Sequence, residues 1–143
     1  MQESPKIINK HILFVEDDVF LCEILNGLLR KAGFNVTLAS DGSQAIARLK
    51  EFVPDIVLLD LILPNIGGFA VLKQIKADER TASVPVIILS NLGSQDDIQR
   101  GFHLGASAYL IKSSSVPEEI IAKIKEVLKI PETADNKNTI YGS

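Results

Sequence analysis

Several residue types that mark other classes of protein are scarce in this 143-residue chain. Its single cysteine, Cys22, excludes an internal disulfide and fits a reducing compartment. Tryptophan is absent, and the two histidines, His11 and His103, have no partner at metal-ligand spacing. We interpret Cys22 as a small buried hydrophobic residue and both histidines as structural or solvent-exposed.

Long apolar runs and targeting signals are also lacking. No apolar segment approaches the roughly 20 residues of a membrane span, and residues 1–10 contain no apolar core of signal-peptide length. No glycine-rich loop of nucleotide-binding type follows the first apolar run. We therefore expect a cytoplasmic protein that binds neither membranes nor nucleotides. The net charge of −3 and the pI near 5.4 argue against direct contact with nucleic acid.

What is present is a repeated alternation of strand and helix patterns. Short, nearly continuous apolar runs predict buried strands over residues 11–16, 35–39, 54–60, 84–90 and 107–112. Apolar residues at helical spacing predict helices over residues 19–32, 43–51, 68–77, 94–104 and 116–129. Five such units predict an α/β fold, a five-stranded parallel sheet of order 2-1-3-4-5 with helices on both faces. This arrangement is the flavodoxin-like, doubly wound one.

One domain accounts for this pattern, because about 150 residues is a common domain length. We place the domain at residues 9–130, after an N-terminal extension at residues 1–8. Residues 131–143 are polar and aperiodic, which is typical of a flexible tail or the start of a truncated linker.

Local signals refine the helices. Ser94 with Asp97, and Ser115 with Glu118, form candidate capping boxes. Gly101, inside the fourth helix, costs ~1 kcal/mol relative to alanine, and it serves either close packing or a helix that shifts easily. Six apolar residues of the first helix are expected to share one face, namely Phe20, Leu21, Ile24, Leu25, Leu28 and Leu29.

Polar residues stand where the predicted strands end. Glu16, Asp17 and Asp18 follow the first strand, Asp60 ends the third, Ser90 the fourth and Lys112 the fifth. The carboxyl ends of parallel strands share one edge, and this strand order opens a crevice between the first and third strands. Carboxylates clustered there are unfavourable unless a cation compensates them. Mg²⁺ suits the site because it binds one or two carboxylates together with phosphate oxygens.

These residue types suit phosphoryl transfer to a carboxylate. An aspartate can act as the nucleophile and form an aspartyl phosphate. The transition state spreads negative charge over the phosphoryl oxygens, so the protein contributes positioning and positive charge. Lys112 supplies a fixed ammonium, and the Ser90 hydroxyl can donate to a phosphoryl oxygen.

Over about residues 9–130 the chain resembles a two-component response-regulator receiver domain of the CheY-like superfamily. Four ordered stretches carry the likeness, namely residues 12–18 (ILFVEDD), 54–64 (PDIVLLDLILP), 84–90 (VPVIILS) and 105–112 (GASAYLIK). The resemblance implies that Asp60 accepts a phosphoryl group from a sensor histidine kinase or a phosphotransfer protein. It also implies that Glu16, Asp17, Asp60 and the backbone carbonyl of Ile62 hold Mg²⁺, while Asp18 caps the first helix.

The resemblance further implies a switch. Ser90 and Lys112 would bind the phosphoryl group, and Tyr109 would turn inward as Ser90 moves toward it. The face formed by the fourth helix, the fifth strand and the fifth helix would then change shape and bind a downstream protein partner or output domain, or a second copy in a homodimer. The domain would not be an enzyme, since it only assists its own phosphorylation and slow dephosphorylation.

Three residues depart from the pattern of similar receivers. Lys112 is usually followed by a proline in a cis peptide bond, but Ser113 follows it here. A non-proline cis bond costs ~3 kcal/mol. The sequence leaves the isomer of this bond open, and a trans bond would place the lysine differently. Asn91 replaces a small residue, often alanine, and is expected to crowd the path of Tyr109. Gly67 replaces a common aspartate and softens its loop.

Two other classes of protein compete with this interpretation. A metal-dependent hydrolase with an aspartyl nucleophile typically needs a second aspartate two residues later, where this chain has Ile62. A phosphorylation-independent interaction module on the same scaffold usually loses a site residue, whereas this chain keeps all five. Ile62 and Leu92 would border the phosphoryl group, and neither can orient an attacking water. We therefore expect slow self-dephosphorylation.

Overall fold

Five strands and five helices alternate along residues 7–131, the part of the chain that the computed structural model describes. The strands are β1 His11–Val15, β2 Asn35–Ala39, β3 Ile56–Leu59, β4 Val86–Ser90 and β5 Ala108–Ile111. The helices are α1 Val19–Lys31, α2 Gly42–Glu51, α3 Gly68–Ala77, α4 Gln95–His103 and α5 Pro117–Leu128, and a short 3-10 helix, η1 Lys112–Ser114, follows β5. Within the described range, no helix is both long and apolar enough to cross a membrane. Most of the predicted extension and tail, residues 1–6 and 132–143, lies outside the described residues.

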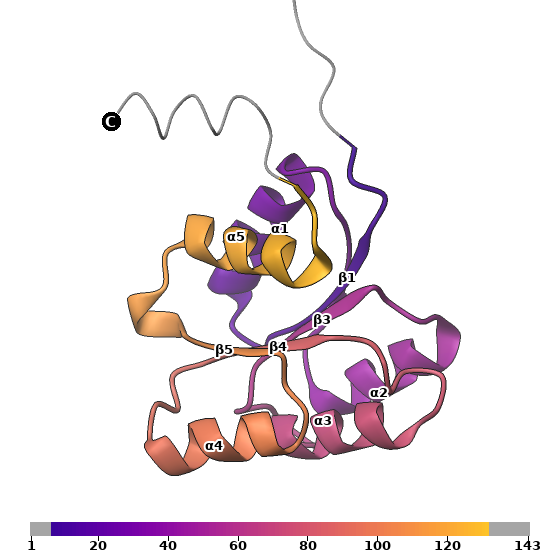
Figure 1. Ribbon diagram of the computed structural model, residues 1–143, viewed down its shortest axis with the longest axis vertical. Helices are drawn as coiled ribbons and strands as arrows, with labels where there is room; N and C mark the ends of the chain where they lie inside the picture. The colour runs from indigo at the N-terminus through magenta and orange to yellow at the C-terminus, as the bar shows by residue number, and fades with distance from the viewer. Residues whose placement is uncertain (1–6, 132–143) are drawn as a thin grey trace, which may run out of the picture.

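The strands form one parallel sheet of order β2-β1-β3-β4-β5, so the predicted flavodoxin-like fold is confirmed. Figure 1 shows α1 and α5 on one face of the sheet and α2, α3 and α4 on the other. The β1–β3 pairing continues one residue past the end of β3, since the Asp60 amide donates to the Val15 carbonyl at 3.1 Å. The loops that begin at Glu16 and Asp60 therefore start side by side.

Two apolar layers, one on each face of the sheet, hold the helices. Leu13 of β1 packs into the layer under α2 and α3, whereas its neighbours Ile12 and Phe14 pack into the layer under α1 and α5. Each of β1, β3 and β4 is buried on both faces, which explains why their sequences are nearly continuous apolar runs.

Two strands begin two residues later than the sequence pattern predicts. The apolar runs at 54–60 and 84–90 each contain a proline near the start, Pro54 and Pro85, while β3 begins at Ile56 and β4 at Val86. Proline has no amide hydrogen to donate to a strand ladder, so pairing starts after it.

The apolar face predicted for α1 is only partly buried. Leu25 and Leu29 are completely buried, but Phe20 is 79% exposed and Ile24 59% exposed. Consecutive helical residues are rotated by about 100°, so Ile24 lies on a stripe beside the one that carries Leu25. The expectation of one shared face is therefore wrong, because the apolar surface of α1 is wider than its contact with the sheet and α5.

Two predicted helix caps are present. The Asp18 carboxylate accepts a hydrogen bond from the Leu21 amide at 3.2 Å and starts α1. The Ser94 hydroxyl accepts one from the Asp97 amide at 3.1 Å and starts α4. Each satisfies an amide that has no partner within its own helix.

The cap predicted at Ser115 is shifted by one residue. The residue before α5 is Val116, and the Glu119 carboxylate accepts from its amide at 3.0 Å, where the sequence suggested Ser115 with Glu118. Pro117 takes the first helical position, where its missing amide hydrogen leaves no bond unmade. Because Pro117 is the first helical residue, the cap falls on Val116 and not on Ser115.

Candidate functional site

A cleft of about 440 Å³ opens at the carboxyl edge of the sheet. The residues that line it are Glu16, Asp17, Asp18, Asp60, Ile62, Asn91 and Lys112. They come from the ends of β1, β3, β4 and β5, around the point where the direction of winding reverses. Ligands of doubly wound folds bind at this point, so the cleft is the candidate site.

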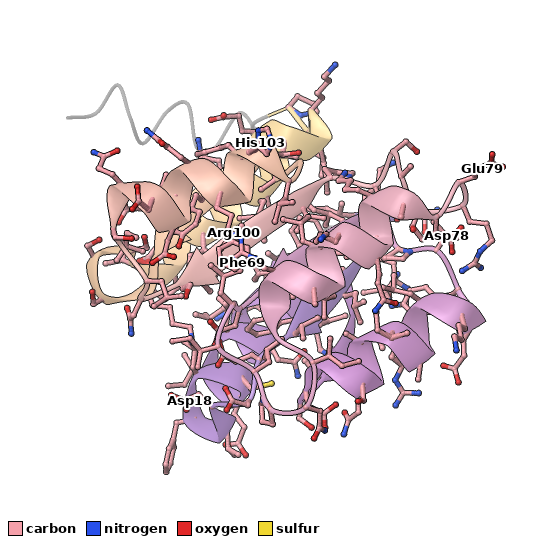
Figure 2. The ribbon with its side chains drawn as sticks, turned by 90° about the horizontal axis from the view of Figure 1, so that it is seen from below. Asp18, Phe69, Asp78, Glu79, Arg100 and His103 are labelled. Atoms are coloured by element: carbon pink, nitrogen blue, oxygen red, sulfur yellow. The ribbon has the colours of Figure 1, made fainter. Side chains whose placement is uncertain are left out.

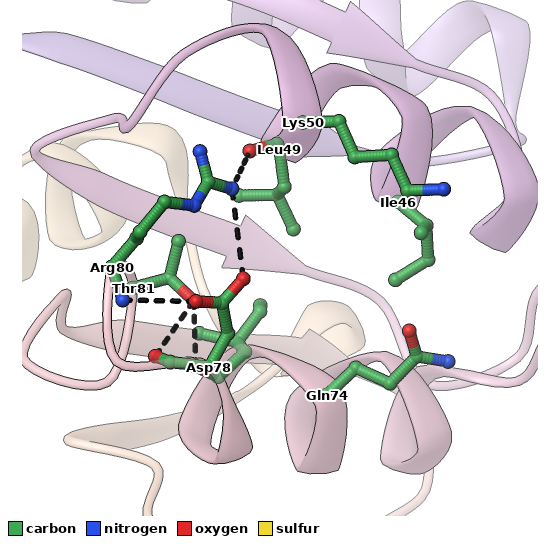
Figure 3. A pocket seen from close by; sticks show the side chains of 8 residues that line it. Ile46, Leu49, Lys50, Gln74, Asp78, Arg80 and Thr81 are labelled. Carbon is green, nitrogen blue, oxygen red and sulfur yellow. Dashed lines mark hydrogen bonds and ion pairs between the residues drawn. The ribbon is translucent and has the colours of Figure 1, made fainter.

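A second hollow, of about 90 Å³, lies between α2 and α3 (Figure 3). The Arg80 guanidinium there donates to the Leu49 carbonyl at 2.6 Å and forms an ion pair with Asp78 at 3.6 Å. Arg80 thus links the end of α2 with the residues after α3. Nothing in the hollow matches the cluster of acids in the larger cleft.

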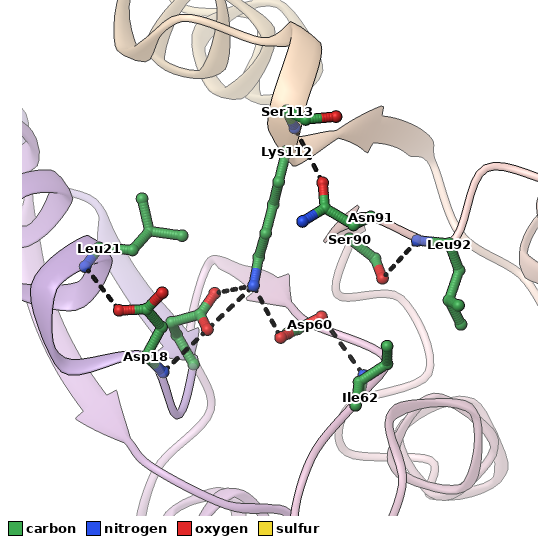
Figure 4. Close-up of polar contacts among 10 residues, drawn as sticks. Asp18, Leu21, Asp60, Ile62, Ser90, Asn91, Leu92, Lys112 and Ser113 are labelled. Carbon is green, nitrogen blue, oxygen red and sulfur yellow. Dashed lines mark hydrogen bonds and ion pairs between the residues drawn. The ribbon is translucent and has the colours of Figure 1, made fainter.

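Lys112 lies between two buried carboxylates in the larger cleft. Its ammonium nitrogen, Nζ, is 2.9 Å from Asp60 Oδ2, 3.0 Å from Glu16 Oε2 and 2.8 Å from Glu16 Oε1. Glu16 is only 2% exposed and Asp60 4% exposed, so neither charge is well hydrated. Figure 4 shows the lysine side chain descending from the end of β5 to reach Asp60. Its charge offsets the repulsion between the two acids.

Backbone amides orient the same two carboxylates. The Asp18 amide donates to Glu16 Oε2 at 3.0 Å, and the Ile62 amide donates to Asp60 Oδ1 at 3.3 Å. Glu16 Oε1 is buried without a hydrogen-bond partner among the described residues, because the nearby ammonium of Lys112 lacks the alignment of a hydrogen bond. One buried carboxylate oxygen is thus left incompletely satisfied.

The pKa values of Glu16 and Lys112 are both shifted upward. Burial raises the pKa of the Glu16 carboxyl, and the nearby Asp60 carboxylate adds to the rise, while the hydrogen bond from Lys112 opposes it. Burial alone would lower the pKa of Lys112, but its hydrogen bonds to Asp60 and Glu16 outweigh this effect and raise the pKa above its ordinary value. Lys112 therefore carries its full charge at neutral pH.

The acidic residues of the cleft fit a divalent cation. One carboxylate oxygen from each of Glu16, Asp17 and Asp60 can be chosen so that all three lie within 4.8 Å of one another. Oxygen ligands of this kind suit Mg²⁺. The three carboxylates outnumber the single ammonium of Lys112, and Glu16 Oε1 is a buried oxygen in need of a partner. The donor set therefore matches the metal site that the sequence suggested.

Ser90 stands apart from the charged groups that line the cleft. It is completely buried at the end of β4, and its hydroxyl oxygen accepts from the Leu92 amide at 3.3 Å. The Leu92 carbonyl accepts a hydrogen bond from the Tyr109 hydroxyl. Ser90 and Tyr109 are thus connected through Leu92.

The Tyr109 ring packs under α4 at the place where that helix has a glycine. A Cβ atom on Gly101 would lie 2.7 Å from Ile88 Cδ1 and 3.0 Å from the Tyr109 ring. The close-packing interpretation of Gly101 is therefore supported. Burial raises the pKa of the Tyr109 hydroxyl, and the charges of Asp97 and Asp60 raise it further, so it remains a hydrogen-bond donor at neutral pH.

The residues after Ser90 and Lys112 meet each other. The Lys112–Ser113 bond, whose isomer the sequence left open, is trans, since residues 7–131 include no cis peptide bond. The Ser113 amide donates to the Asn91 side-chain oxygen at 2.9 Å (Figure 4). The Asn91 side-chain oxygen is thus engaged by Ser113, and the expected crowding of the Tyr109 path stays a prediction. The sequence pointed to both residues as departures and did not reveal that they bond to each other.

The remaining residues singled out from the sequence lie away from the cleft. His11 bonds to the Thr37 hydroxyl oxygen at 2.6 Å and contacts the Phe52 ring, while Cys22 packs beside the core with a pKa raised by burial. Figure 2 shows His103 at the end of α4. In the same view Arg100 lies over the Phe69 ring, 4.3 Å from its centre, and ties α4 to α3.

Comparison with known proteins identifies the family. Residues 12–125 match the model of the response regulator receiver domain. The chain belongs to this family. It is thus a receiver domain of two-component systems, and the resemblance inferred from the four sequence stretches is confirmed.

Relatives of this receiver domain include regulators roughly twice its length. It is 36% identical over 133 residues to the DNA-binding dual master transcriptional regulator RpaA of Synechocystis sp., covering 90% of this chain and 55% of the relative. It is 43% identical over 118 residues to the sensory transduction protein RegX3 of Mycolicibacterium smegmatis, covering 82% and 50%. The chain thus spans about half the length of the curated relatives it matches. The expected lack of contact with nucleic acid is not supported by relatives described as DNA-binding.

Solved receiver structures superpose on the chain. The receiver domain of the sensor histidine kinase PA1611 from Pseudomonas aeruginosa, which has a magnesium ion in its active-site cleft, matches with a TM-score of 0.77 at 29% identity. That match covers 85% of this chain and 99% of the other. A response regulator from Chloroflexus aurantiacus matches with a TM-score of 0.79 at 30% identity, covering 85% and 99%.

Proposed function

We propose that this receiver accepts a phosphoryl group on Asp60, from a phosphohistidine of a sensor histidine kinase or phosphotransfer protein. The carrying observation is that Asp60 is buried at the cleft floor, held by the Ile62 amide and paired with Lys112. A carboxylate oxygen of Asp60 would form a bond to phosphorus as the phosphorus–nitrogen bond of the donor breaks. The released histidine takes up a proton from solvent.

The surrounding residues supply positive charge and orientation in this proposal. Lys112, already 2.9 Å from Asp60, is placed to stabilise the negative charge of the transferred group. Ser90, at the end of the adjacent strand, would donate its hydroxyl hydrogen to a phosphoryl oxygen.

Mg²⁺ would be held by Glu16, Asp17, Asp60 and the backbone carbonyl of Ile62. When bound, it would neutralise charge shared between the acids and the phosphoryl group. A relative's receiver domain with magnesium in its cleft, and the close carboxylate oxygens of this chain, support this assignment.

Output would follow from a change in the face formed by α4, β5 and α5. Tyr109 and Leu92 connect Ser90 with α4, so a shift of Ser90 would bias two states of this face. The partner would be a downstream protein or an output domain, and a second copy in a homodimer would use the same face. We propose that the phosphoryl transfer to Asp60 takes place in the cytoplasm.

The competing function is phosphorylation-independent protein binding on the same scaffold. Two residues next to the site, Asn91 and Ser113, depart from the usual receiver pattern, and this departure is the observation that favours the competing function. The clustered carboxylates and Lys112 favour the phosphoacceptor instead, since a protein-binding scaffold has no need to bury two acids beside one lysine.

Intact-mass spectrometry after incubation with acetyl phosphate and Mg²⁺ tests the proposed function. We expect a species heavier by about 80 Da, the mass of one phosphoryl group, and its disappearance in Asp60→Asn. Asp78→Asn, at an exposed position far from the cleft, is the matched control and should still react. An unchanged mass, in conditions where another receiver reacts, would refute the proposal.

Slow loss of the phosphoryl group is expected as well. Ile62 is 59% exposed at the cleft, and Leu92 is half-buried, so neither side chain can hydrogen-bond an attacking water. Ile62→Asn introduces such a group and should speed hydrolysis about tenfold, equivalent to about 1.4 kcal/mol. Decay of the phosphorylated mass after removal of acetyl phosphate measures this rate. An unaltered decay would show that residue 62 does not control the water.

A further inference from the structure

A single hydrogen bond joins the residues that follow the two proposed phosphoryl-binding side chains. Asn91 comes directly after Ser90, and Ser113 directly after Lys112. The Asn91 side-chain oxygen accepts from the Ser113 amide at 2.9 Å, across 22 residues of sequence. We call this hydrogen bond the Asn91–Ser113 clasp.

The clasp extends the pairing of two strands beyond the end of their ladder. The last pair in the β4–β5 register is Ser90 with Ile111. After that pair β4 runs into a loop and β5 into η1, so the backbones no longer bond there as strands. The Asn91 side chain, just after β4, replaces the next backbone hydrogen bond by accepting from the Ser113 amide, just after β5.

Without Asn91 the Ser113 amide would depend on solvent, and the lysine loop would be tied less firmly to the sheet. The Lys112 ammonium reaches Asp60 and Glu16 at the end of a long side chain, whose position depends on the backbone of η1. Ordering such a long side chain costs conformational entropy, and a backbone that is already fixed reduces what remains to be ordered, so it favours the bonded arrangement.

The two departures from the usual receiver pattern are therefore connected. A proline at residue 113 would have no amide hydrogen to donate, and an alanine at residue 91 would have no oxygen to accept it. Each unusual residue supplies the half of the bond that the other requires.

We propose that Asn91 is a positioning residue, which holds the Lys112 loop through Ser113 and thereby places the lysine against Asp60. The proposal rests on the proposed function for its effect on phosphoryl transfer. Its structural part, the placement of Lys112, stands independently of that function. Because the bond is exposed, solvent replaces it partly when it is lost, and we expect a several-fold effect.

A double-mutant cycle isolates the clasp. Asn91→Leu keeps similar bulk without an acceptor, and Ser113→Pro removes the donor. We expect Asn91→Leu to slow phosphorylation by acetyl phosphate about fivefold in the natural background, and to have no effect in the Ser113→Pro background. Ser114→Ala, in the same 3-10 helix, is the matched control and should leave the rate unchanged. Equal effects of Asn91→Leu in both backgrounds, or no effect in either, would overturn the proposal.

An NMR measurement separates this proposal from the proposed function. In the unphosphorylated protein, Asn91→Leu should speed hydrogen exchange of the Ser113 amide and weaken the ammonium resonance of Lys112, whereas Ser114→Ala should change neither. If the chain is not phosphorylated but these changes occur, the proposed function fails and the clasp stands. If both resonances are unchanged, the clasp does not position the lysine and the proposal is wrong.

Discussion

Lys112→Met should destabilise the fold by about 3 kcal/mol at neutral pH, as expected when one partner of a buried ion pair is removed. Methionine keeps an unbranched stem of similar length and removes the ammonium, with both its charge and its hydrogen bonds to Glu16 and Asp60. Glu16 and Asp60, at 2% and 4% exposed, would then repel each other without a cation between them. Thermal or urea unfolding measures the change, which corresponds to a fall in melting temperature of about 10 °C for a domain of this size.

Added Mg²⁺ provides an internal test of the same variant. Since Lys112→Met leaves three clustered carboxylates without their ammonium, millimolar Mg²⁺ should restore much of the lost stability. The pKa of Lys112 is raised in the folded protein, so its ammonium contributes fully to stability at any pH below the ordinary lysine value of 10.5. This contribution to stability is lost as the pH rises through the higher pKa of the folded protein. The deficit should therefore be fully developed at pH 7.

The control for this variant is Lys123→Met on α5. Lys123 pairs with Glu126 at 3.2 Å on the surface, and the Glu126 side chain is 70% exposed. Exposed pairs of this kind contribute little to stability, so we expect a change below about 0.5 kcal/mol. Equal destabilisation by the two variants would show that the cleft charges are well hydrated, and would remove the physical basis of the proposed site.

Gly68→Ala should be equally damaging for a steric reason. Gly68 is the first residue of α3, and a Cβ atom there would lie 2.3 Å from the Asp60 carbonyl oxygen and 2.5 Å from Leu61 Cα. Backbone atoms cannot turn away as a side chain can, so either α3 or the strand end that carries Asp60 must shift. We expect a loss of about 3 kcal/mol, at the upper end for overpacking.

Gly27→Ala is the matched control for Gly68→Ala. Gly27 lies within α1, and a Cβ atom added there would have nothing within 4 Å beyond its own helix backbone and chain neighbours. The same substitution there should stabilise the protein by about 1 kcal/mol, because alanine favours helix over glycine. Urea unfolding of both variants gives the comparison. Similar small changes at the two positions would mean that the end of β3 yields easily, and that the placement of Asp60 is not set by α3.

Much of the fold could be predicted from the sequence because its signals are local. The apolar runs of β1, β3 and β4 are continuous because both faces are covered, and the helices between them show their own period. The predicted strand order and the receiver family are both confirmed. The errors lie at element ends and on α1. Pro54 and Pro85 move the starts of β3 and β4 to later residues, and Pro117 fixes the first turn of α5. The sequence also cannot show how much of the apolar face of α1 is buried.

The candidate site was predictable to the same extent. Parallel strands bring their carboxyl ends to one edge, so the positions of Glu16, Asp60 and Lys112 in the sequence already indicate a shared cleft. Their roles in phosphoryl transfer remain predictions. Which groups bond to each other, and which are buried, could not be predicted, because side-chain contacts depend on distances between segments 22 to 96 residues apart.

From the sequence alone we could predict the order of the elements, the parallel sheet and the acidic, hydroxyl and lysine residues at its carboxyl edge. Periodicity and strand-end position are properties of neighbouring residues, so they can be recognised without knowledge of the tertiary structure. Three contacts became known from the folded structure: Lys112 bridges Glu16 and Asp60, Gly68 has backbone atoms where a side chain would be, and Asn91 accepts from Ser113. These contacts form between loops distant in the chain, and packing of the whole sheet sets their separations.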